Sequence, residues 1–568
     1  MTAGQASDSI GLLSWAARRP RLVLALFCLI LWAPGVFSLP PLDRDESRFA
    51  QASKQMLETG DLVDIRFGHV PRYKKPVGIY WLQAATTAVA GFGERAAIWT
   101  YRLPSLFGAL TLVWLTFWCA GAFLRREVAL LAGALLGGTL LLTGEATIAT
   151  TDAVLSAAIL GAQAVLFRIW LASRGAAVAP PKWMVLVGWA AFGAAVLVKG
   201  PVIFAVVGVT AVGLSLWERN WRWLMGTRPL IGVAIVVAMV APWMIAIAVK
   251  SHGQFFHQSL GQDFATKLAG GQESHGAPPG YFLIALTPSF WPAILFLLPG
   301  LAVAIRNHRD PAIRFLLVWL ATWVLFELTP TKLPHYVLPL YPVLAIFSAL
   351  WAMWPGTSNT LWDRLAFWIA PLQFVIGAVV FAVAPVLLPA KYGLGPAWWA
   401  VVPALLFTGV AAAALIFYFR RQALTAALIA IAAPLFVYPV LTAGVGPTLS
   451  QIWVSPRLAS TLQSLARPGD PPPALAGYIE PSMLFLTGTE TRLTDSGASA
   501  ADAKASEGGL AAVETREAAS FAAELAKKGA EAVAVGSVDG LNYSNGRKVQ
   551  IRIWRVAPQS WEPPPPAE

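Results

Sequence analysis

The chain has 568 residues, of which 57% are hydrophobic and only 13% are charged. Soluble globular proteins carry about 25% charged residues, so this composition excludes an ordinary soluble enzyme and predicts a polytopic α-helical membrane protein. The formal net charge of +12 at pH 7 belongs mostly to basic connections between apolar segments, and we do not interpret it as nucleic-acid binding.

About thirteen segments are long and apolar enough to cross a bilayer as helices. We place them at 21–39, 101–122, 128–148, 152–173, 183–199, 201–217, 228–249, 281–304, 313–329, 333–353, 365–388, 397–419 and 423–446. Under this count the clusters of Lys and Arg in short connections share one side, which the positive-inside rule assigns to the cytoplasm. The sequence therefore predicts a multi-pass protein of the bacterial inner membrane with a cytoplasmic N-terminus.

A polar loop at 40–81 follows the first predicted span. Asp43 and Glu46 have the spacing of a capping box in which Asp replaces the usual Ser or Thr. Apolar residues at helical spacing follow, and Gly60 is a typical stop signal. We expect a short amphipathic helix that lies on the membrane surface.

Carboxylates begin this loop and cations end it. Asp45 comes shortly after the first span, and Lys74 and Lys75 precede the next apolar stretch. Side chains of opposite charge held at a membrane surface suit a site that handles an anionic group. The alternative is that Asp43 or Asp45 only caps the following helix.

Two acids lie near the outer ends of predicted spans. Glu145 is close to the end of the segment 128–148, and Asp152 begins the segment 152–173. Ionisable residues within spans are costly and usually face a cavity or a partner, so we expect Asp152 to line a polar pocket, with a helix cap as the alternative. Lys199 ends the segment 183–199, a position from which lysines commonly snorkel to the interface.

Two further outer connections carry candidate phosphate ligands. The loop 250–280 has no metal-binding spacing such as H-E-x-x-H, so a tight zinc site is not expected there, and an ordinary solvated loop is its alternative. The connection at 329–336 supplies Lys332, His335 and Tyr336, each of which can donate a hydrogen bond to a phosphate oxygen. Here the alternatives are a snorkelling lysine and an interfacial aromatic belt.

The composition changes after Gly446. Segments 476–481, 531–538 and 549–556 have strand patterns, and 515–529 has an amphipathic helical pattern that ends at a glycine. We therefore predict a transmembrane domain at 1–446 with periplasmic loops 40–100 and 250–280, a periplasmic α/β domain at 447–560, and a disordered proline tail at 561–568.

The order of several short motifs resembles that in lipid-linked sugar transferases of the GT-C class. The motifs are Asp45-Glu46 with Arg48-Phe49-Ala50, Tyr73-Lys74-Lys75-Pro76 with Tyr80-Trp81, Arg102-Leu103-Pro104-Ser105, Leu197-Val198-Lys199-Gly200-Pro201 and Lys332-Leu333-Pro334-His335-Tyr336. Over about 40–345 the chain is similar to bacterial aminoarabinose transferases that act on lipid A and to protein O-mannosyltransferases. The former usually have Glu-Lys-Pro where this chain has Lys74-Lys75-Pro76, which leaves the sugar open.

The resemblance implies inverting transfer of a sugar from a polyprenyl-phosphate donor to a lipid (lipid A-like), glycan or protein acceptor on the outer face. An inverting displacement uses a base to activate the acceptor, and we expect Asp45 in that role, with Glu46 and Asp152 next. The residues expected at the donor phosphate are Lys75, Lys267, Lys332, Tyr336 and Arg48, and those expected at the sugar or substrate are Lys74, Tyr73, Glu145, His275 and His335.

No nucleotide cofactor is expected, because the chain has no credible glycine-rich phosphate loop. No metal ligand is assigned, although Asp45, Glu46 and Asp152 also suit a divalent cation. The expected partners are the donor, the acceptor and membrane lipids, and we expect a monomer. The alternative function is a transporter or flippase of lipid-linked sugars, against which the lack of a visible repeated half argues.

Overall fold

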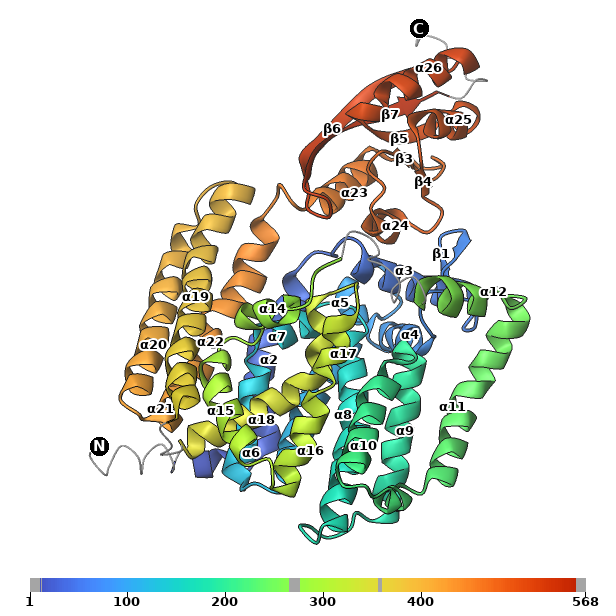
Figure 1. Ribbon diagram of the computed structural model, residues 1–568. Helices are drawn as coiled ribbons and strands as arrows, with labels where there is room; N and C mark the ends of the chain where they lie inside the picture. The colour runs from blue at the N-terminus through green and yellow to red at the C-terminus, as the bar shows by residue number, and fades with distance from the viewer. Residues whose placement is uncertain (1–10, 12, 265–275, 356–359, 558–568) are drawn as a thin grey trace.

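The computed structural model describes residues 11, 13–264, 276–355 and 360–557. Apolar helices form one large bundle, and a smaller domain with a β-sheet sits on one end of it (Figure 1). The helix α3 (Asp45–Thr59) lies across that end of the bundle, between the two parts. The expected α-helical membrane fold with a small C-terminal α/β domain is confirmed.

Ten helical segments of the described residues are long and apolar enough to span a membrane, or eleven if a bent pair counts as one span. The expected number of thirteen is not confirmed. The predicted span 201–217 contains only the shorter apolar helix α10 (Val202–Trp217), and the predicted span 281–304 is divided between α14 (Tyr281–Ser289) and the shorter apolar helix α15 (Ile294–Arg306). The long segments are Pro20–Ser38, Ile98–Ala120, Asp152–Ser173, Lys182–Lys199, Pro229–Lys250, Pro311–Leu328, Pro334–Met353, Leu361–Tyr392, Trp398–Phe419 and Ala423–Thr448.

The helices of the bundle run in the following order. They are α2 (Pro20–Ser38), α4 (Gly78–Ala90), α5 (Ile98–Ala120), α6 (Arg126–Gly137), α7 (Leu140–Thr147), α8 (Asp152–Ser173), α9 (Lys182–Lys199), α10, α11 (Pro229–Lys250), α12 (Gln254–Phe256), α14 (Tyr281–Ser289), α15, α16 (Pro311–Leu320), α17 (Trp323–Leu328), α18 (Tyr341–Met353), α19 (Leu361–Tyr392), α20 (Val401–Phe419), α21 (Ala423–Ala432) and α22 (Pro434–Pro439).

The bent pair α6 and α7 determines where two acids lie. The two helices meet at 64°, and the chain then turns through a short connection into α8. Glu145 on α7 and Asp152 at the start of α8 are therefore both buried near the same end of the bundle. On α5, a Cβ at Gly108 would come within 2.8 Å of the backbone nitrogen of Val154, so the glycine permits the close approach of α5 and α8.

The polar loop after α2 contains α3 and a hairpin of β1 (Arg66–Phe67) and β2 (Val70–Pro71). The predicted end of α3 is confirmed, since Gly60 adopts a left-handed conformation with φ of 74°. The predicted capping box is wrong: the N-cap of α3 is Arg44, and no side chain caps the helix. Glu46 instead pairs with Arg102 of α5, and Asp43 accepts a hydrogen bond from Ser455 of the C-terminal domain.

The C-terminal domain begins with α23 (Val454–Leu465) and contains a five-stranded sheet in the order β4-β3-β5-β7-β6. Strand β3 is parallel to β4 and β5, and β7 is antiparallel to β5 and β6. The other elements are β3 (Ala474–Ala476), α24 (Pro481–Thr487), β4 (Arg492–Thr494), α25 (Gly497–Glu507), β5 (Gly509–Glu514), α26 (Ala518–Lys528), β6 (Ala532–Asn542) and β7 (Arg547–Val556).

Three of the four elements predicted in this domain are confirmed, as β6, β7 and α26. The strand predicted at 476–481 is displaced, because β3 ends at Ala476 and Gly477 turns the chain with φ of 83°. The expected disordered tail at 561–568 lies outside the described residues.

Helix α24 attaches the C-terminal domain to α3 and to the bundle. The Phe485 ring packs edge-on against Tyr101 with ring centroids 5.6 Å apart. Lys54 of α3 donates a hydrogen bond of 3.1 Å to the Phe485 carbonyl, and Gln51 donates one of 2.7 Å to Thr489. The domain is thus seated directly on the helix that begins with Asp45.

Candidate active site

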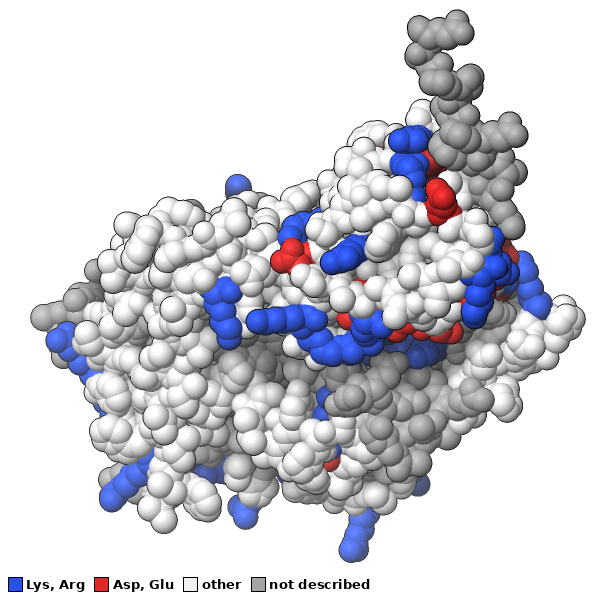
Figure 2. Space-filling model, turned by 90° about the horizontal axis from the view of Figure 1, so that it is seen from above, with Lys and Arg blue, Asp and Glu red and all other residues white. Residues whose placement is uncertain are grey.

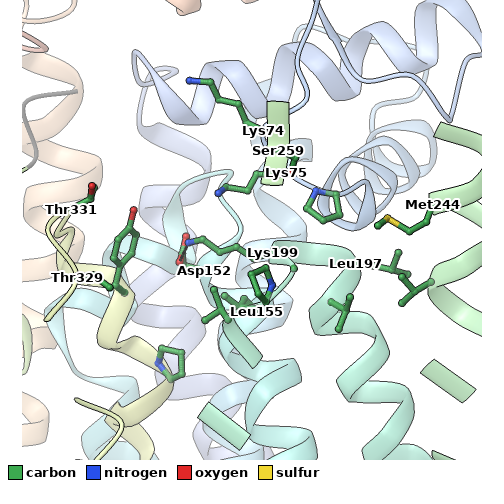
Figure 3. A pocket seen from close by; sticks show the side chains of 18 of the residues that line it. Lys74, Lys75, Asp152, Leu155, Leu197, Lys199, Met244, Ser259, Thr329 and Thr331 are labelled. Carbon is green, nitrogen blue, oxygen red and sulfur yellow. Dashed lines mark hydrogen bonds and ion pairs between the residues drawn. The ribbon is translucent and has the colours of Figure 1, made fainter. Parts of the chain in front are cut away.

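A cavity of about 230 Å³ opens where α8 begins and α9 ends, beneath the polar loop. Most of its wall is apolar, which suits a hydrocarbon chain. Figure 3 shows Lys75, Lys199 and Asp152 close together at one side of the cavity, with Leu197 and Met244 away from them. The apolar part of the wall includes Leu155, Val196, Leu197, Val202, Val240, Met244, Phe255 and Phe326.

The polar side of the cavity combines residues from segments far apart in the sequence. Lys74 and Lys75 come from the polar loop, Asp152 from α8, and Tyr336 from the connection before α18. Four of the predicted site residues thus line one cavity. The other polar side chains in its wall are Lys199, Ser259, Thr329 and Thr331.

Asp152 and Lys199 form an ion pair inside this wall. The Lys199 Nζ lies 2.5 Å from Asp152 Oδ1, and the side chains are 11% and 7% exposed. The ammonium also lies 5.1 Å from the centroid of the Tyr336 ring. Lys199 therefore does not snorkel to an interface; it contributes a buried cation to the cavity. In the sequence, the signals for Lys199 are its position before Gly200-Pro201 at the end of an apolar run and its place in a motif of the resembled family.

His335 connects Asp152 to Glu145. Its Nδ1 lies 3.3 Å from Glu145 Oε1, and its Nε2 lies 3.8 Å from Asp152 Oδ2. Both ring nitrogens face carboxylate oxygens, an arrangement that suits the imidazolium form, in which both nitrogens donate. The predicted substrate residues Glu145 and His335 thus form a cluster with Asp152.

The same three residues are the metal-ligand cluster found among the described residues. One ligand atom each from Glu145, Asp152 and His335 lies within 4.8 Å of the others. However, the Lys199 ammonium already pairs with Asp152 at 2.5 Å, and an ion bound by these three residues would have to displace it. The charge balance therefore disfavours a resident divalent cation here.

Glu46 is held in a buried ion pair with Arg102. Arg102 Nε donates to Glu46 Oε1 at 2.8 Å, and Nη2 donates to Oε2 at 2.9 Å, with both side chains almost completely buried. The backbone amides of Leu42 and Ala149 donate to the same carboxylate at 2.8 Å each. With its oxygens occupied in this way, Glu46 is better interpreted as a structural residue than as a base.

Asp45 is an exposed carboxylate in the turn 42–46, just before and at the start of α3. It begins α3, its side chain is 58% exposed, and its nearest cation is Arg48 at 3.6 Å. Neither residue is among the described residues that line the cavity. Arg48 thus approaches Asp45, where we had expected it to approach a phosphate.

The remaining predicted residues are not among the described residues that line the cavity. Tyr73 donates a hydrogen bond of 2.8 Å to Asp64 of the same loop and packs against Phe255 of α12, so its contacts hold the polar loop in place. Lys332 is buried, and its ammonium donates to the Thr329 carbonyl at 2.5 Å. Lys267 and His275 lie outside the described residues.

Comparison with known proteins shows what the chain is similar to. Residues 17–254 match the family described as dolichyl-phosphate-mannose-protein mannosyltransferase. The chain is 29% identical to the undecaprenyl phosphate-alpha-4-amino-4-deoxy-L-arabinose arabinosyl transferase of Pseudomonas paraeruginosa over 56% of this chain and 58% of that one. The protein of the same name from Pectobacterium carotovorum is 27% identical over 63% of each chain. The match thus spans less than two thirds of the length of these relatives.

Solved structures show the same fold over nearly the whole chain. The crystal structure of ArnT from Cupriavidus metallidurans bound to undecaprenyl phosphate aligns with a TM-score of 0.72 at 18% identity, covering 99% of this chain and 100% of that one. The apo oligosaccharyltransferase of Archaeoglobus fulgidus aligns with a TM-score of 0.50 at 11% identity, over 83% of this chain and 64% of that one. The similarity to GT-C glycosyltransferases that the motifs indicated is confirmed.

Proposed function

We propose that this chain is a membrane glycosyltransferase that moves a sugar from a polyprenyl-phosphate donor to an acceptor at the outer leaflet, with inversion at the sugar. The observation that carries the proposal is the cavity itself, in which an apolar wall meets Lys75, Lys199 and Tyr336. A polyprenyl phosphate needs this combination, since its tail is hydrocarbon and its head is an anion. The arabinosyl transferases that the chain resembles are named for an undecaprenyl phosphate donor.

We also propose an orientation, with the N-terminus in the cytoplasm of a bacterial inner membrane. The basic connections between the spans support it, because the positive-inside rule assigns them to the cytoplasmic side. The transmembrane domain 1–446 then presents the cavity to the periplasm, together with the α/β domain 447–560. We propose that the protein works as a monomer.

In the reaction, the bond between the sugar C1 and the phosphate oxygen breaks while an acceptor oxygen attacks C1 from the opposite face. The phosphate leaves with the bonding electron pair, and negative charge grows on it. Lys75 lines the polar side of the cavity, where it can stabilise that charge together with the Tyr336 hydroxyl. Phosphate is a good leaving group, so the mechanism needs no separate general acid.

The acceptor proton passes to a carboxylate. Asp45 is the best candidate, because Glu46 is saturated by Arg102 and Asp152 is paired with Lys199. Asp152 instead forms part of the sugar side of the cavity, held in place by His335 and Lys199. If the acceptor is itself a phosphate, it arrives ionised, and Asp45 then orients it.

An anionic acceptor fits the outer surface. Figure 2 looks down on the C-terminal domain and shows many Lys and Arg side chains, with some Asp and Glu side chains among them, in a band along the border between that domain and the helical part. Such a band attracts lipid headgroups that carry phosphate. We therefore propose a lipid A-like acceptor before a neutral glycan or a protein.

The deciding experiment uses the full chain in proteoliposomes that contain a polyprenyl phosphate with a radiolabelled sugar and an acceptor lipid fraction. We expect free polyprenyl phosphate to appear together with label on the acceptor. Movement of the intact donor between leaflets without its cleavage would instead support a flippase and contradict the proposal.

Lys75→Ala is expected to weaken binding of polyprenyl phosphate by about tenfold to a hundredfold, since a charge-assisted contact contributes about 1.5–3 kcal/mol. The measurement is a titration of the detergent-solubilised protein with polyprenyl phosphate. Lys527→Ala is the matched control, because Lys527 is an exposed lysine of α26. Equal affinity of the Lys75→Ala and control variants would remove Lys75 from the phosphate site.

A further inference from the structure

The turn at 42–46, which carries Asp45, is clamped from two sides. On the bundle side, Arg102 holds Glu46, and the Leu42 amide donates to the same carboxylate. On the outer side, Asp43 is buried against the C-terminal domain. Asp45 lies between these two anchors and remains exposed.

Asp43 is enclosed by hydroxyl groups of three separate segments of the C-terminal domain. Its Oδ1 accepts hydrogen bonds from Ser455 of α23, at 2.9 Å, and from Ser482 of α24. Its backbone amide donates to the Tyr543 hydroxyl at 2.6 Å, next to the end of β6. Tyr478 completes the cluster through a 2.6 Å hydrogen bond to Ser455. We call Ser455, Tyr478, Ser482 and Tyr543 the hydroxyl cradle.

The backbone between the anchors is strained. Arg44 has φ of 63° and ψ of −114°, a region that side chains other than glycine rarely adopt and that costs about 1–3 kcal/mol. Such a conformation persists only where the surroundings hold both neighbours in place. Here the cradle holds Asp43 and the Arg102 pair holds Glu46.

From this geometry we infer that the C-terminal domain is part of the active site, because its hydroxyl cradle holds Asp43 and thereby positions Asp45 for the acceptor. Asp43, Ser455, Ser482 and Tyr543 are then positioning residues. The inference rests on the proposed function for the role of Asp45. A domain that served only as an acceptor platform would need contacts with α3, such as those of Phe485, but would not need a buried carboxylate on the strained turn.

The test uses Ser455→Ala with Ser482→Ala in the full chain, and Ser464→Ala as the control. Ser464 lies exposed on the same helix as Ser455 and bonds only its own helix backbone at Thr461. We expect backbone amides of 39–47 to exchange with deuterium about tenfold faster in the double variant, while β5 is unchanged. We also expect slower single-turnover transfer at an unaltered affinity for polyprenyl phosphate.

Unchanged exchange at 39–47 would overturn the inference whatever the activity. If exchange in β5 also rises, the double substitution has loosened the whole C-terminal domain. Tyr543→Phe is then the variant that tests the inference, because it removes only the hydroxyl that accepts a hydrogen bond from the Asp43 amide. Unaltered exchange and transfer in Tyr543→Phe would overturn the inference. Failure of the wild-type chain to bind or cleave the donor would contradict the proposed function, and the exchange experiment would still test the clamp.

The clamp is expected to depend on pH. Burial raises the pKa of Asp43 from 3.8 to about 6, and the nearby Glu480 carboxylate adds to this, while Ser482, Ser455 and Tyr543 act against it. The clamped state therefore binds a proton more tightly than the released state, so docking is strongest at low pH and weakens as pH rises from 3.8 through 6. Tyr478 and Tyr543 stay neutral, because burial raises the pKa of each.

Between pH 5 and pH 7 this difference corresponds to about a tenfold change in the clamping equilibrium. Exchange at 39–47, corrected for the intrinsic effect of pH, is expected to be about tenfold faster at pH 7. Asp43→Asn is expected to show no such dependence. The same pH dependence in Asp43→Asn would assign it to another group and overturn this part of the inference.

Discussion

Arg102→Met is expected to destabilise the protein by about 3–5 kcal/mol, the cost of leaving one member of a buried ion pair without its partner. The substitution removes the donors to both Glu46 oxygens and also to the carbonyls of Val36, Leu39 and Pro40. These carbonyls end α2 and begin the polar loop, so the arginine joins the first span to the turn. The measurement is the thermal unfolding temperature of the detergent-solubilised protein, which is expected to fall strongly in Arg102→Met.

The control is Arg125→Met, because Arg125 is 75% exposed and lies 3.7 Å from Glu127. Exposed pairs contribute about 0–1 kcal/mol, so this variant should unfold close to the wild-type temperature. The double variant Glu46→Leu with Arg102→Met should recover part of the loss, since replacing both charges removes the unpaired one. Equal stability of Arg102→Met and Arg125→Met would show that the buried pair is dispensable.

Much of the fold could be predicted because the bilayer imposes length and hydropathy on each span. The two predicted spans that are not full-length helices are 201–217, which is the shorter helix α10, and 281–304, where the chain breaks between α14 and α15. Hydropathy alone does not show such differences, because each of these segments is as apolar as a full span. The break between α6 and α7 was hidden for the same reason, although it places Glu145 beside His335.

The site was harder to predict than the fold because partners of a buried charge come from distant segments. Glu46 and Asp43 have the spacing of a capping box, yet Glu46 reaches Arg102 and Asp43 reaches Ser455. Local spacing describes what a side chain could do near its own backbone. A partner hundreds of residues away, such as Ser455 or Ser482 for Asp43, leaves no pattern in a single sequence.

Lys199 is a position where the sequence left a snorkelling lysine open as the alternative to a functional one. Its place at the end of α9 is typical of a snorkelling lysine, and an exposed ammonium would have been the result. The Asp152 carboxylate holds it in the cavity instead. Hydropathy does not distinguish these outcomes, because both keep the same residue at the same helix end.

Asp45→Asn is expected to lower the rate of sugar transfer by about 10²–10⁴-fold, which is the usual contribution of a general base. Asparagine has nearly the same shape and cannot take the acceptor proton. The side chain is exposed and forms an ion pair with Arg48 at 3.6 Å, so folding and membrane insertion should be unaffected. The measurement is single-turnover transfer at saturating donor, with affinity for polyprenyl phosphate determined separately.

Asp502→Asn is the matched control, because it removes an exposed carboxylate of the C-terminal domain that pairs with Lys528. This variant should transfer sugar at the wild-type rate. Loss of donor affinity in Asp45→Asn would move Asp45 from the acceptor side to the phosphate side. Full activity of purified Asp45→Asn would remove it as the base, and since Glu46 is enclosed by Arg102 and Asp152 is held by Lys199, it would imply an acceptor that arrives already ionised.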